Sequence, residues 1–498
     1  MSNAKDSRDA ASSLDLSDEA LAELSQQTSE LVMDYFTRVG ELAVFPDTSA
    51  GATIRRLGTE LPSEGDSIER ILNDCRAMFD FSRHNGHPRF FGYVASPATA
   101  PGAFADLMAS SLNANVTSWR SSPAATEVEQ LVIRWLGSMV GFSENAAGFL
   151  TSGGSLANLN ALLIAQRAHA PADVGRTGLW NISKPQTIYV SDQVHMSITK
   201  AADILGFGRD QVRVVPSDKR FRINLDALRK QIAHDAENGA QPFCVVGSAG
   251  TVNTGAVDQL DKIAAIAKEF KLWFHVDGAY GALAAMDENK RALFKGIEQA
   301  DSLSLDAHKW LYTPIDAGCL LLRDLNAARK VFSANEADYI KIHEQTDQES
   351  FAFWDYGVEL SRRFRALKIW LTLRYFGTRR ISRAISEDLA LAVYLSEEIK
   401  KSDDFELLAP VELSICCFRY LPKKYRRSKS VVDSKQLDEI NSQVMHAVQR
   451  GGEAYLSNAT IDGRFALRTC ITNFRTTRAD IDQTLEVIRS AARELGHE

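Results

Sequence analysis

The 498-residue sequence has few cysteines and lacks long apolar runs, and these absences exclude several classes of protein. Its 6 cysteines are scattered and form no C-x-x-C pair, so we expect neither a disulfide framework nor a metal site. Such cysteine usage is typical of a reducing compartment, and we expect a cytoplasmic protein. No stretch approaches the ~18 consecutive apolar residues of a transmembrane helix. The first residues show no secretion signal, so a membrane is not an expected partner.

An excess of positive charge is also absent. The chain carries 57 Lys and Arg against 64 Asp and Glu, a formal net charge of −7. A dedicated nucleic-acid binder needs a basic face, so we do not expect nucleic acid as a partner. The hydrophobic fraction of 45% and the charged fraction of 24% are ordinary for a folded globular chain. At this length, about two to four structural units are expected.

The first region, residues 1–95, is predicted to be an N-terminal helical arm with a linker. Ser17 can begin a helix that runs toward Leu42, because leucines follow it at helical spacing. The segment 46–67 contains proline and glycine and is expected to be an extended connection.

Residues 96–378 show the alternation of a large α/β domain. Short β-rich runs alternate with helical patterns such as Leu260–Phe270. Apolar strands separated by helices predict a mostly parallel central sheet with helices on both faces. Residues 379–498 begin with a long amphipathic helix and then predict a small α+β domain. The β-rich runs of the large domain are Thr187–Val190, Phe243–Val246, Leu272–Val276, Ser302–Leu305 and Cys319–Leu322.

Ligands of open α/β sheets bind beyond the carboxyl ends of the strands, so the residues that follow each strand are the candidates for chemistry. After the apolar run 148–150, the turn Thr151–Ser155 leads into a helix. The first turn of a helix presents free N–H groups and a positive dipole end, which suit a phosphate. The turn lacks the lysine of the nucleotide P-loop. Taken alone, the turn is a weak signal, and a tight strand-to-helix connection explains it better than a phosphate site does.

Each of four further strand ends carries a chemically useful group. Taken singly, each has an ordinary structural explanation, such as a helix cap or a hydrogen-bonded core histidine. Together at one edge of a sheet, they indicate a site. The groups are His195 after one strand, Thr251 after the next, then Asp277, and finally His308 with Lys309.

A lysine, a buried acid and a phosphate seat together suit pyridoxal 5'-phosphate (PLP). The aldehyde of this cofactor forms a Schiff base with a lysine, and its ring nitrogen needs a carboxylate partner. Lys309 and Asp277 can serve in these two positions. His195 can stack on the ring, and Ala279 is small enough to allow close packing on the other face.

With these residues the sequence resembles the group II PLP-dependent decarboxylases. This family includes aromatic-L-amino-acid, histidine, glutamate and cysteine-sulfinate decarboxylases. The resemblance extends over about residues 88–376 and more loosely to both ends. Two elements, H-V-D-x-A-[YF] and x-x-H-K-W, are jointly very specific. Asp277 of the first and Lys309 of the second are separated by 32 positions. The matching segments are Thr151–Ser155, His275–Tyr280 and Asp306–Trp310.

The resemblance implies a type I PLP-dependent transferase fold, a homodimer and a set of residue roles. Lys309 is the Schiff-base lysine, and Asp277 pairs with the pyridine nitrogen. His195 stacks on the ring and can reach the substrate carboxylate. Tyr339 matches the tyrosine of a mobile loop that protonates Cα after CO₂ has left. The remaining cofactor-binding residues implied are Gly153, Gly154, Ser155, Thr251, Ala279, Ser302 and His308.

The implied activity is α-decarboxylation of an L-amino acid to the amine and CO₂. Tyr93, Val94 and Thr117 match the substrate pocket, and an aromatic substrate such as tyrosine, dopa or tryptophan is favoured. No further Arg or Lys is clearly placed to hold a side-chain carboxylate. The polar residues in this region also suit an acidic or small polar substrate, namely glutamate, aspartate, cysteine sulfinate or diaminobutyrate.

Two other functions stay open. The first is oxidative deamination to an aldehyde, an activity of some members of the family. Tyr339 argues against this activity, because the aldehyde-forming members carry another residue at that position. A cofactor-binding protein without catalytic activity is the other, and Lys309, Asp277 and His195 argue against it.

Two segments depart from or extend the matching pattern. Asp306 stands where animal relatives commonly carry Asn, and a carboxylate close to a phosphate would repel it. The basic run Arg362–Lys368 also matches the family, and a structural role, anchoring a helix, is expected for it.

Overall fold

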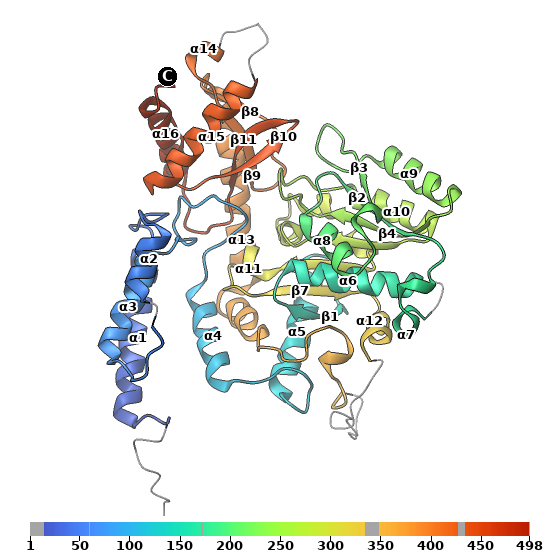
Figure 1. Ribbon diagram of the computed structural model, residues 1–498, viewed down its shortest axis with the longest axis horizontal. Coiled ribbons are helices and arrows are strands. Elements are labelled where there is room, and N and C mark those ends of the chain that lie inside the picture. Colours follow the sequence, from blue (N-terminus) through green and yellow to red (C-terminus); the bar gives the residue numbers. More distant parts are fainter. Residues whose placement is uncertain (1–13, 59, 171–172, 334–347, 427–433, 498) are drawn as a thin grey trace, which may run out of the picture.

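The structure is a computed structural model that describes residues 14–58, 60–170, 173–333, 348–426 and 434–497. It contains a large α/β domain, a smaller α+β domain and an N-terminal helical arm (Figure 1). Among the described residues, no helix has the length and apolar character needed to cross a bilayer.

The large domain is built on a seven-stranded sheet in the order β1-β7-β6-β5-β4-β2-β3. Neighbouring strands from β3 to β6 run parallel, whereas β7 is antiparallel to both β1 and β6. The predicted mostly parallel sheet is therefore confirmed. The strands are β1 (Ala147–Thr151), β2 (Gln186–Ser191), β3 (Val212–Val215), β4 (Gln241–Ser248), β5 (Trp273–Asp277), β6 (Ser302–Asp306) and β7 (Gly318–Leu322).

Helices cover both faces of this sheet (Figure 1). Helix α6 (Gly154–His169) packs against β4, β5, β6 and β7, while α9 (Leu225–Glu237) and α10 (Leu260–Phe270) pack against β4. Because both faces are covered, all five residues of β6 and of β7 are buried. The other helices of this part are α4 (Ala100–Leu112), α5 (Pro123–Met139), α7 (Val174–Thr177), α8 (Met196–Ile204), α11 (Ala307–Trp310) and α12 (Leu325–Phe332).

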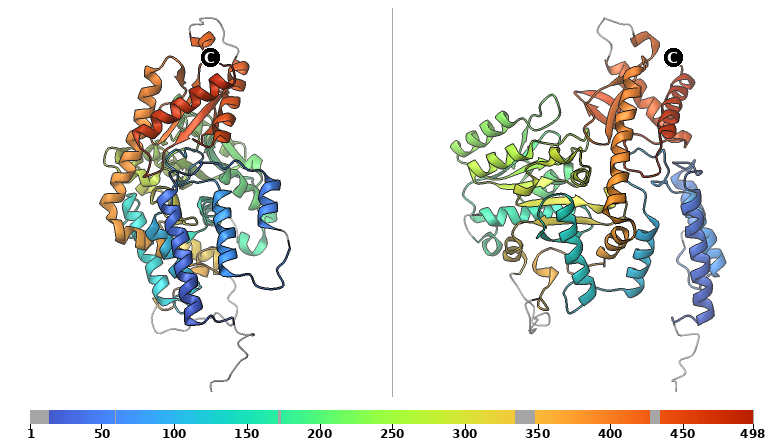
Figure 2. Two further views of the ribbon diagram at one scale, coloured as in Figure 1. Left: turned by 90° about the vertical axis from the view of Figure 1, so that its left-hand side faces the viewer. Right: turned by 180° about the vertical axis from the view of Figure 1, so that it is seen from behind.

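The N-terminal arm is helical and stands apart from the large domain (Figure 2). Helix α1 (Asp18–Arg38) begins as predicted, because the Ser17 hydroxyl accepts a hydrogen bond from the Ala20 N–H. The expectation of an extended connection over 46–67 is wrong in part. Ser49 caps a second helix there, α2 (Ala50–Leu57), and α3 (Ile68–Asp80) follows.

Helix α13 (Ala366–Lys401) joins the two domains and runs along both (Figure 2). Gly377 interrupts its helical geometry with φ 71°, which a glycine adopts without strain. The predicted boundary at 378/379 falls beside this kink, and the division into domains stays a prediction. The small domain has a four-stranded antiparallel sheet in the order β10-β11-β9-β8. Its elements are β8 (Phe405–Leu407), β9 (Ile415–Tyr420), α14 (Lys423–Arg426), α15 (Ser434–Gly451), β10 (Ser457–Ile461), β11 (Arg464–Cys470) and α16 (Arg478–Glu494).

Candidate functional site

A cavity of about 580 Å³ lies at the carboxyl edge of the large sheet, where β11 of the small domain closes it. The strand-end residues that sequence analysis selected converge on it from five separate segments. Eleven of the predicted site residues line the cavity, and Asp306 lies beside them. The eleven are Tyr93, Val94, Gly153, Gly154, Ser155, His195, Thr251, Asp277, Ala279, His308 and Lys309.

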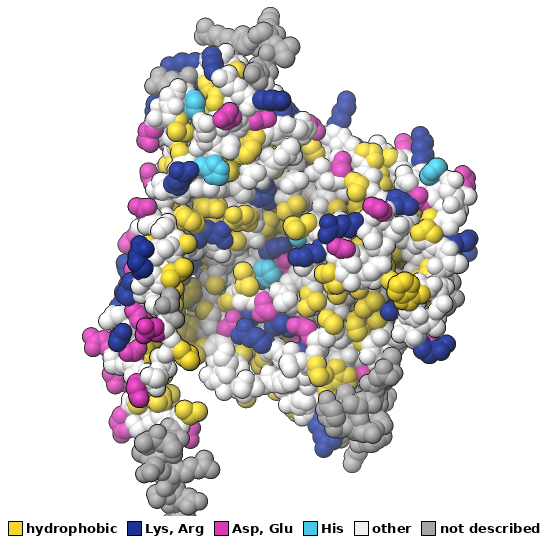
Figure 3. All heavy atoms as spheres, in the orientation of Figure 1, with side chains coloured by type: hydrophobic (Ala, Val, Ile, Leu, Met, Phe, Trp, Pro, Cys, Tyr) yellow, Lys and Arg dark blue, Asp and Glu magenta, His cyan; other side chains and the backbone are white. Residues whose placement is uncertain are grey.

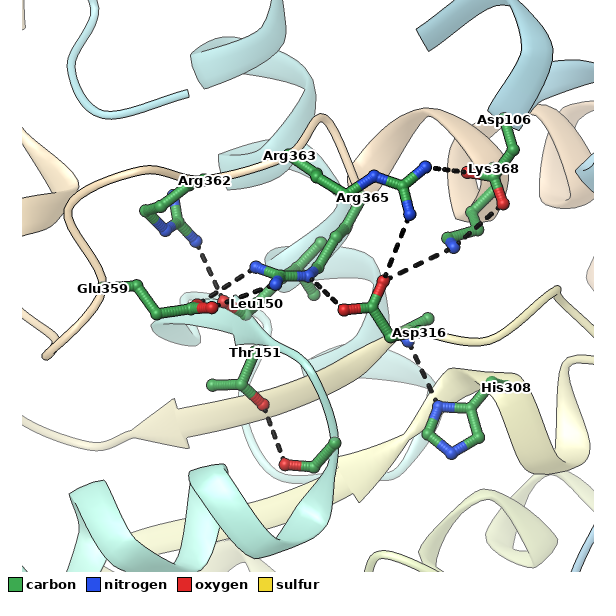
Figure 4. A network of polar contacts seen from close by, with 12 residues as sticks. Asp106, Leu150, Thr151, His308, Asp316, Glu359, Arg362, Arg363, Arg365 and Lys368 are labelled. Carbon is green, nitrogen blue, oxygen red and sulfur yellow. Dashed lines mark hydrogen bonds and ion pairs between the residues drawn. The ribbon is translucent and has the colours of Figure 1, made fainter. Parts of the chain in front are cut away.

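The turn between β1 and α6 forms one end of the cavity. Gly153 precedes the helix and Gly154 is its first residue, so the first N–H groups of α6 face this end of the site. A Cβ on Gly154 would lie 2.7 Å from the Ala279 Cβ, and a Cβ on Gly318 would lie 2.4 Å from the Gly153 Cα. The Thr151 hydroxyl donates to the Gly153 carbonyl at 3.0 Å and closes the turn (Figure 4). The turn is therefore shaped by close backbone approach and leaves room for an anion at the helix N-terminus.

Asp277 ends β5 with its carboxylate buried and held from two sides. Its Oδ1 accepts hydrogen bonds from the Ser304 hydroxyl and the Ala279 N–H, both at 3.2 Å. Its Oδ2 accepts a hydrogen bond from the Asn158 amide at 3.1 Å. The carboxylate thus has a fixed orientation at the cavity wall, which suits a partner for a protonated ring nitrogen.

Lys309 and His308 lie on the short helix α11, directly after β6. The Lys309 Nζ is 2.9 Å from the Asp306 Oδ2, and both side chains are largely buried. Within the described residues, the Asp306 Oδ1 is buried without a hydrogen-bond partner. The His308 Nδ1 accepts a hydrogen bond from the Ala317 N–H, and burial lowers the pKa of its imidazole below the usual range. A neutral histidine and an ion-paired lysine therefore stand side by side at the cavity.

His195 and Thr251 come from the connections after β2 and β4. His195 caps α8, and its Nδ1 lies 2.8 Å from the Ser197 Oγ. Thr251 is buried in a tight turn, and its hydroxyl lies 3.0 Å from that of Thr254. Both side chains reach the cavity on which Lys309 and Asp277 converge.

Two of the predicted residues that the structure describes, Ser302 and Thr117, do not line the cavity. Ser302 is the first residue of β6, buried at the opposite end of the strand from Asp306, and its hydroxyl contacts the Trp273 Nε1 and His275 Nδ1 at 2.8 Å each. Its predicted place near the phosphate is therefore wrong. Thr117 is buried, its hydroxyl donates to the Ser121 hydroxyl at 3.1 Å, and it is not among the residues that line the cavity. Tyr339 lies outside the described residues.

Three residues that sequence analysis did not select line the cavity and form hydrogen bonds with its other walls. Asn158 and Ser197 are buried and hydrogen-bonded to each other at 2.9 Å. Arg468 comes from β11, and its guanidinium donates to the carbonyls of Val252 at 2.7 Å and Tyr93 at 2.8 Å. Arg468 thereby ties two walls of the cavity together across the domain boundary. Arg468 lies on the last strand of the small domain, far from the strand ends of the large domain, and the sequence gave no signal for its position.

The basic run Arg362–Lys368 forms a network of ion pairs next to the site (Figure 4). Asp316 lies among three of these cations, 2.9 Å from Arg365, 3.8 Å from Arg363 and 3.9 Å from Lys368. Asp316 directly precedes Ala317, whose N–H holds His308. The expected anchoring role fits these contacts, because the network fixes the segment behind His308.

A larger cavity, about 920 Å³, lies elsewhere, between the arm, the start of α4 and α13. Its lining includes Phe36, Tyr375, Phe376 and Phe474, and hydrophobic side chains gather along the hollow beside the arm (Figure 3). None of the strand-end residues lines it, so its size does not make it the reaction site.

The residues of the smaller cavity fit a flat, phosphate-bearing aldehyde. The helix N-terminus could hold a phosphate, the Lys309 amine could bond an aldehyde carbon, and the Asp277 carboxylate could pair with a ring nitrogen. Because a Cβ at position 154 would lie 2.7 Å from the Ala279 Cβ, any side chain at this position would fill the space next to the helix N-terminus. Among the described residues, no group of three or more His, Cys, Asp or Glu side chains is placed to hold a metal ion.

Comparison with known proteins supports this assignment. The model of the "Pyridoxal-dependent decarboxylase conserved domain" matches residues 51–421. An aromatic-L-amino-acid decarboxylase of Bacillus atrophaeus is 35% identical over 97% of each chain. A phenylacetaldehyde synthase of Petunia hybrida is 31% identical over 93% of this chain and 92% of its own. A solved structure of mouse CSAD superposes with a TM-score of 0.90 at 31% identity, covering 96% of this chain and 99% of the other.

Proposed function

The chain belongs to the pyridoxal-dependent decarboxylase family, and from that premise we propose that it converts an aromatic L-amino acid to the amine and CO₂. The observation that carries the proposal is the convergence of Lys309, Asp277 and the turn at Gly154 on one cavity. In the reaction the bond between Cα and the carboxylate breaks and CO₂ leaves. The electron pair of the broken bond stays with Cα until it takes up a proton. Bound PLP supplies the electron sink that makes this bond cleavage possible.

We assign the roles of the residues from their positions in the cavity. The N–H groups at the start of α6 would bind the phosphate, Lys309 would bond the aldehyde carbon, and Asp277 would hold a proton on the ring nitrogen. His195 lines the cavity and would pack against the ring, near the substrate carboxylate. The proton would return to Cα from Tyr339, assigned by the family resemblance because it lies outside the described residues, or from His195.

An aromatic substrate is supported by the names of two relatives and by the cavity wall. The Bacillus relative is an aromatic-L-amino-acid decarboxylase, and the Petunia relative forms an aromatic aldehyde. Tyr93 lies at the mouth of the cavity, with its hydroxyl 3.3 Å from that of Tyr455, and the Arg83 guanidinium lies 5.0 Å from the Tyr93 ring. Such a wall suits a planar side chain with a polar tip.

An acidic or small polar substrate is the first alternative, and Arg468 is the residue that bears on it. Its guanidinium lines the cavity but donates to the carbonyls of Val252 and Tyr93 and to the Ser457 hydroxyl. Most of its donors are therefore engaged with the protein, which favours a role in holding the walls over binding a second substrate carboxylate.

Aldehyde formation is the second alternative, because the Petunia relative carries that activity in its name. In our proposal Tyr339 protonates Cα before oxygen reacts there. We expect Tyr339→Phe to raise the proportion of aldehyde over amine, measured by mass spectrometry of the products. An unchanged ratio would remove Tyr339 from this role and leave His195 as the proton donor.

We also propose a cytoplasmic homodimer. All six cysteines are free, which fits a reducing compartment. Apolar side chains of the arm and of α4 are exposed in the single chain, among them Met33, Leu107 and Leu112. Large exposed apolar patches mark interfaces between proteins, and these exposed side chains support the proposal. Sedimentation of the purified protein at twice the mass of one chain is the expected result, and a monomer would contradict it.

The role of Lys309 has a direct spectroscopic test. Lys309→Ala should lose the visible absorbance of the covalently bound cofactor and all decarboxylation. Lys262→Ala, at an exposed lysine of α10, is the matched control and should keep both. Retention of the absorbance band in Lys309→Ala would remove this lysine from the proposed role. A cofactor-binding protein without catalytic activity would instead keep the band in the wild type and yield no amine.

A further inference from the structure

The side chain of Asn158 joins two residues that face the cofactor in the proposed function. It lies on α6, one turn after Gly154, and is buried. Its amide nitrogen donates to the Asp277 Oδ2 at 3.1 Å and to the Ser197 Oγ at 2.9 Å. Its amide oxygen lies 2.9 Å from the His275 Nε2. Both N–H bonds of the amide and its oxygen are therefore engaged with buried partners.

The direction of these hydrogen bonds follows from the chemistry of the partners. An ionised carboxylate only accepts, so the NH₂ group of Asn158 must face Asp277 and the amide oxygen must face His275. The His275 Nε2 therefore carries a proton and donates it. Burial lowers the pKa of His275 to about 4, so its ring is neutral and Nδ1 accepts the proton of the Ser302 hydroxyl at 2.8 Å. Ser302 in turn accepts from the Trp273 indole N–H at 2.8 Å.

The second branch of the network reaches His195. Because the Ser197 Oγ accepts from Asn158, its own proton points to the His195 Nδ1 at 2.8 Å. The Ser197 backbone N–H also donates to this Nδ1, at 3.3 Å. With Nδ1 accepting, a neutral His195 carries its proton on Nε2. A chain of hydrogen bonds thus runs from Trp273 through Ser302 and His275 to Asn158. There it divides into one branch to Asp277 and another, through Ser197, to His195.

We propose that Asn158 is a positioning residue that fixes the Asp277 carboxylate and, through Ser197, the tautomer of His195. The proposal rests on the proposed function, since it assigns both residues to the cofactor. Fixing Asp277 keeps one oxygen directed at the ring nitrogen. Fixing His195 keeps an N–H donor on Nε2, which suits a group that faces the negatively charged carboxylate of a substrate. His275 and Ser302 act behind Asn158 by holding its amide in the required orientation.

The chain offers a closely matched control for this proposal. Asn160 lies two residues further along α6 and is equally buried. Its amide nitrogen donates to the Leu156 carbonyl at 2.8 Å, within the helix itself. Asn158→Ala and Asn160→Ala therefore remove the same buried side chain, and only the first removes the contacts to Asp277 and Ser197.

The experiment compares these variants in cofactor binding and in the visible circular dichroism per bound PLP. A hydrogen bond to a charged group contributes enough that its loss changes an equilibrium by about tenfold or more. We expect Asn158→Ala apoprotein to bind PLP at least about tenfold more weakly and with reduced dichroism. Asn160→Ala should bind within about twofold of the wild type with unchanged dichroism. A melting curve of each variant shows that both are folded.

A third variant separates the two branches. Ser197→Ala leaves the contact between Asn158 and Asp277 in place and removes the link to His195. It should bind PLP with nearly the affinity of the wild type and show a kcat lowered by about tenfold or more. Equal binding and equal dichroism in Asn158→Ala and Asn160→Ala would overturn the proposal. The proposed function fails separately, when wild-type protein with bound PLP releases no amine, and a wild type that binds no PLP would overturn both.

Discussion

The buried ion pair between Glu129 and Arg362 gives a prediction whose size can be worked out from the structure. Glu129 lies on α5 with 0% of its side chain exposed, and Arg362 has 2% exposed. The Glu129 Oε1 accepts from the Arg362 Nη2 and from the Leu150 N–H at 2.9 Å. Arg362 also donates to the carbonyls of Val116 and Leu150, each at 2.9 Å. The ion pair therefore connects α5 to the end of β1, just before the turn Thr151–Ser155.

Glu129→Gln keeps the shape of this side chain and removes its charge, which leaves the Arg362 cation buried without its counter-ion. Removing one partner of a buried ion pair costs about 3–5 kcal/mol. The entropy of unfolding is about 2.1 cal/mol/K per residue, which gives about 1 kcal/mol/K for a chain of this length. We therefore expect the melting temperature of the apoprotein to fall by about 3–5 °C in differential scanning calorimetry.

The matched control is Glu269→Gln, the same substitution at an exposed pair. Glu269 lies 2.8 Å from Arg229, and the two side chains are 48% and 49% exposed. Exposed pairs contribute little, so this variant should melt within about 1 °C of the wild type. A Glu129→Gln protein that also melts within this range would refute the reasoning that burial makes the Glu129 pair structurally important.

Three further predictions follow from single contacts. Asp306→Asn removes the ion pair with Lys309, in which the two side chains are 2.9 Å apart, and a negative charge near the turn Thr151–Ser155. PLP should therefore bind more tightly in an equilibrium titration, and weaker binding would contradict this interpretation. Gly154→Ala places a methyl group 2.7 Å from the Ala279 Cβ and should weaken PLP binding by about tenfold or more in the same titration, whereas unchanged affinity would show that the space next to the helix N-terminus is not the phosphate site. Burial raises the pKa of Asp388 to about 7, so stability is lost as the pH rises from about 4 toward 7. Asp388→Asn should therefore melt above the wild type at pH 8 and by less at pH 5, and an equal difference at both pH values would contradict the assignment.

The strand-end residues could be predicted because a simple geometric rule places them. Asp277 and Lys309 follow apolar runs that are buried on both faces, and parallel strands bring their carboxyl ends to one edge. Ser302 was placed near the cofactor by the family resemblance, and the structure buries it at the opposite end of β6 from the cavity. Asp306 lies four positions further along the strand, which at about 3.3 Å per residue is about 13 Å.

Contacts that depend on packing between distant elements could not be predicted in this way. Asn158 matters because α6 lies against β5, and its polar side chain on an apolar helix face was the signal available in the sequence. Arg468 reaches the cavity because the small domain packs on the large one, and no local pattern encodes that arrangement. Thr117 was placed in the pocket by resemblance, whereas its carbonyl accepts from the Phe353 N–H and its hydroxyl contacts Ser121 in this chain.

The central claim is tested most directly by the products of the PLP-loaded protein. The protein is incubated with L-tyrosine, dopa, tryptophan, histidine, glutamate, aspartate and diaminobutyrate, and the products are identified by mass spectrometry. We predict an amine, lighter than its substrate by one CO₂, from tyrosine, dopa or tryptophan. An amine from glutamate, aspartate or diaminobutyrate alone would overturn the aromatic assignment and keep the reaction. Loss of CO₂ from none of these substrates would contradict the account.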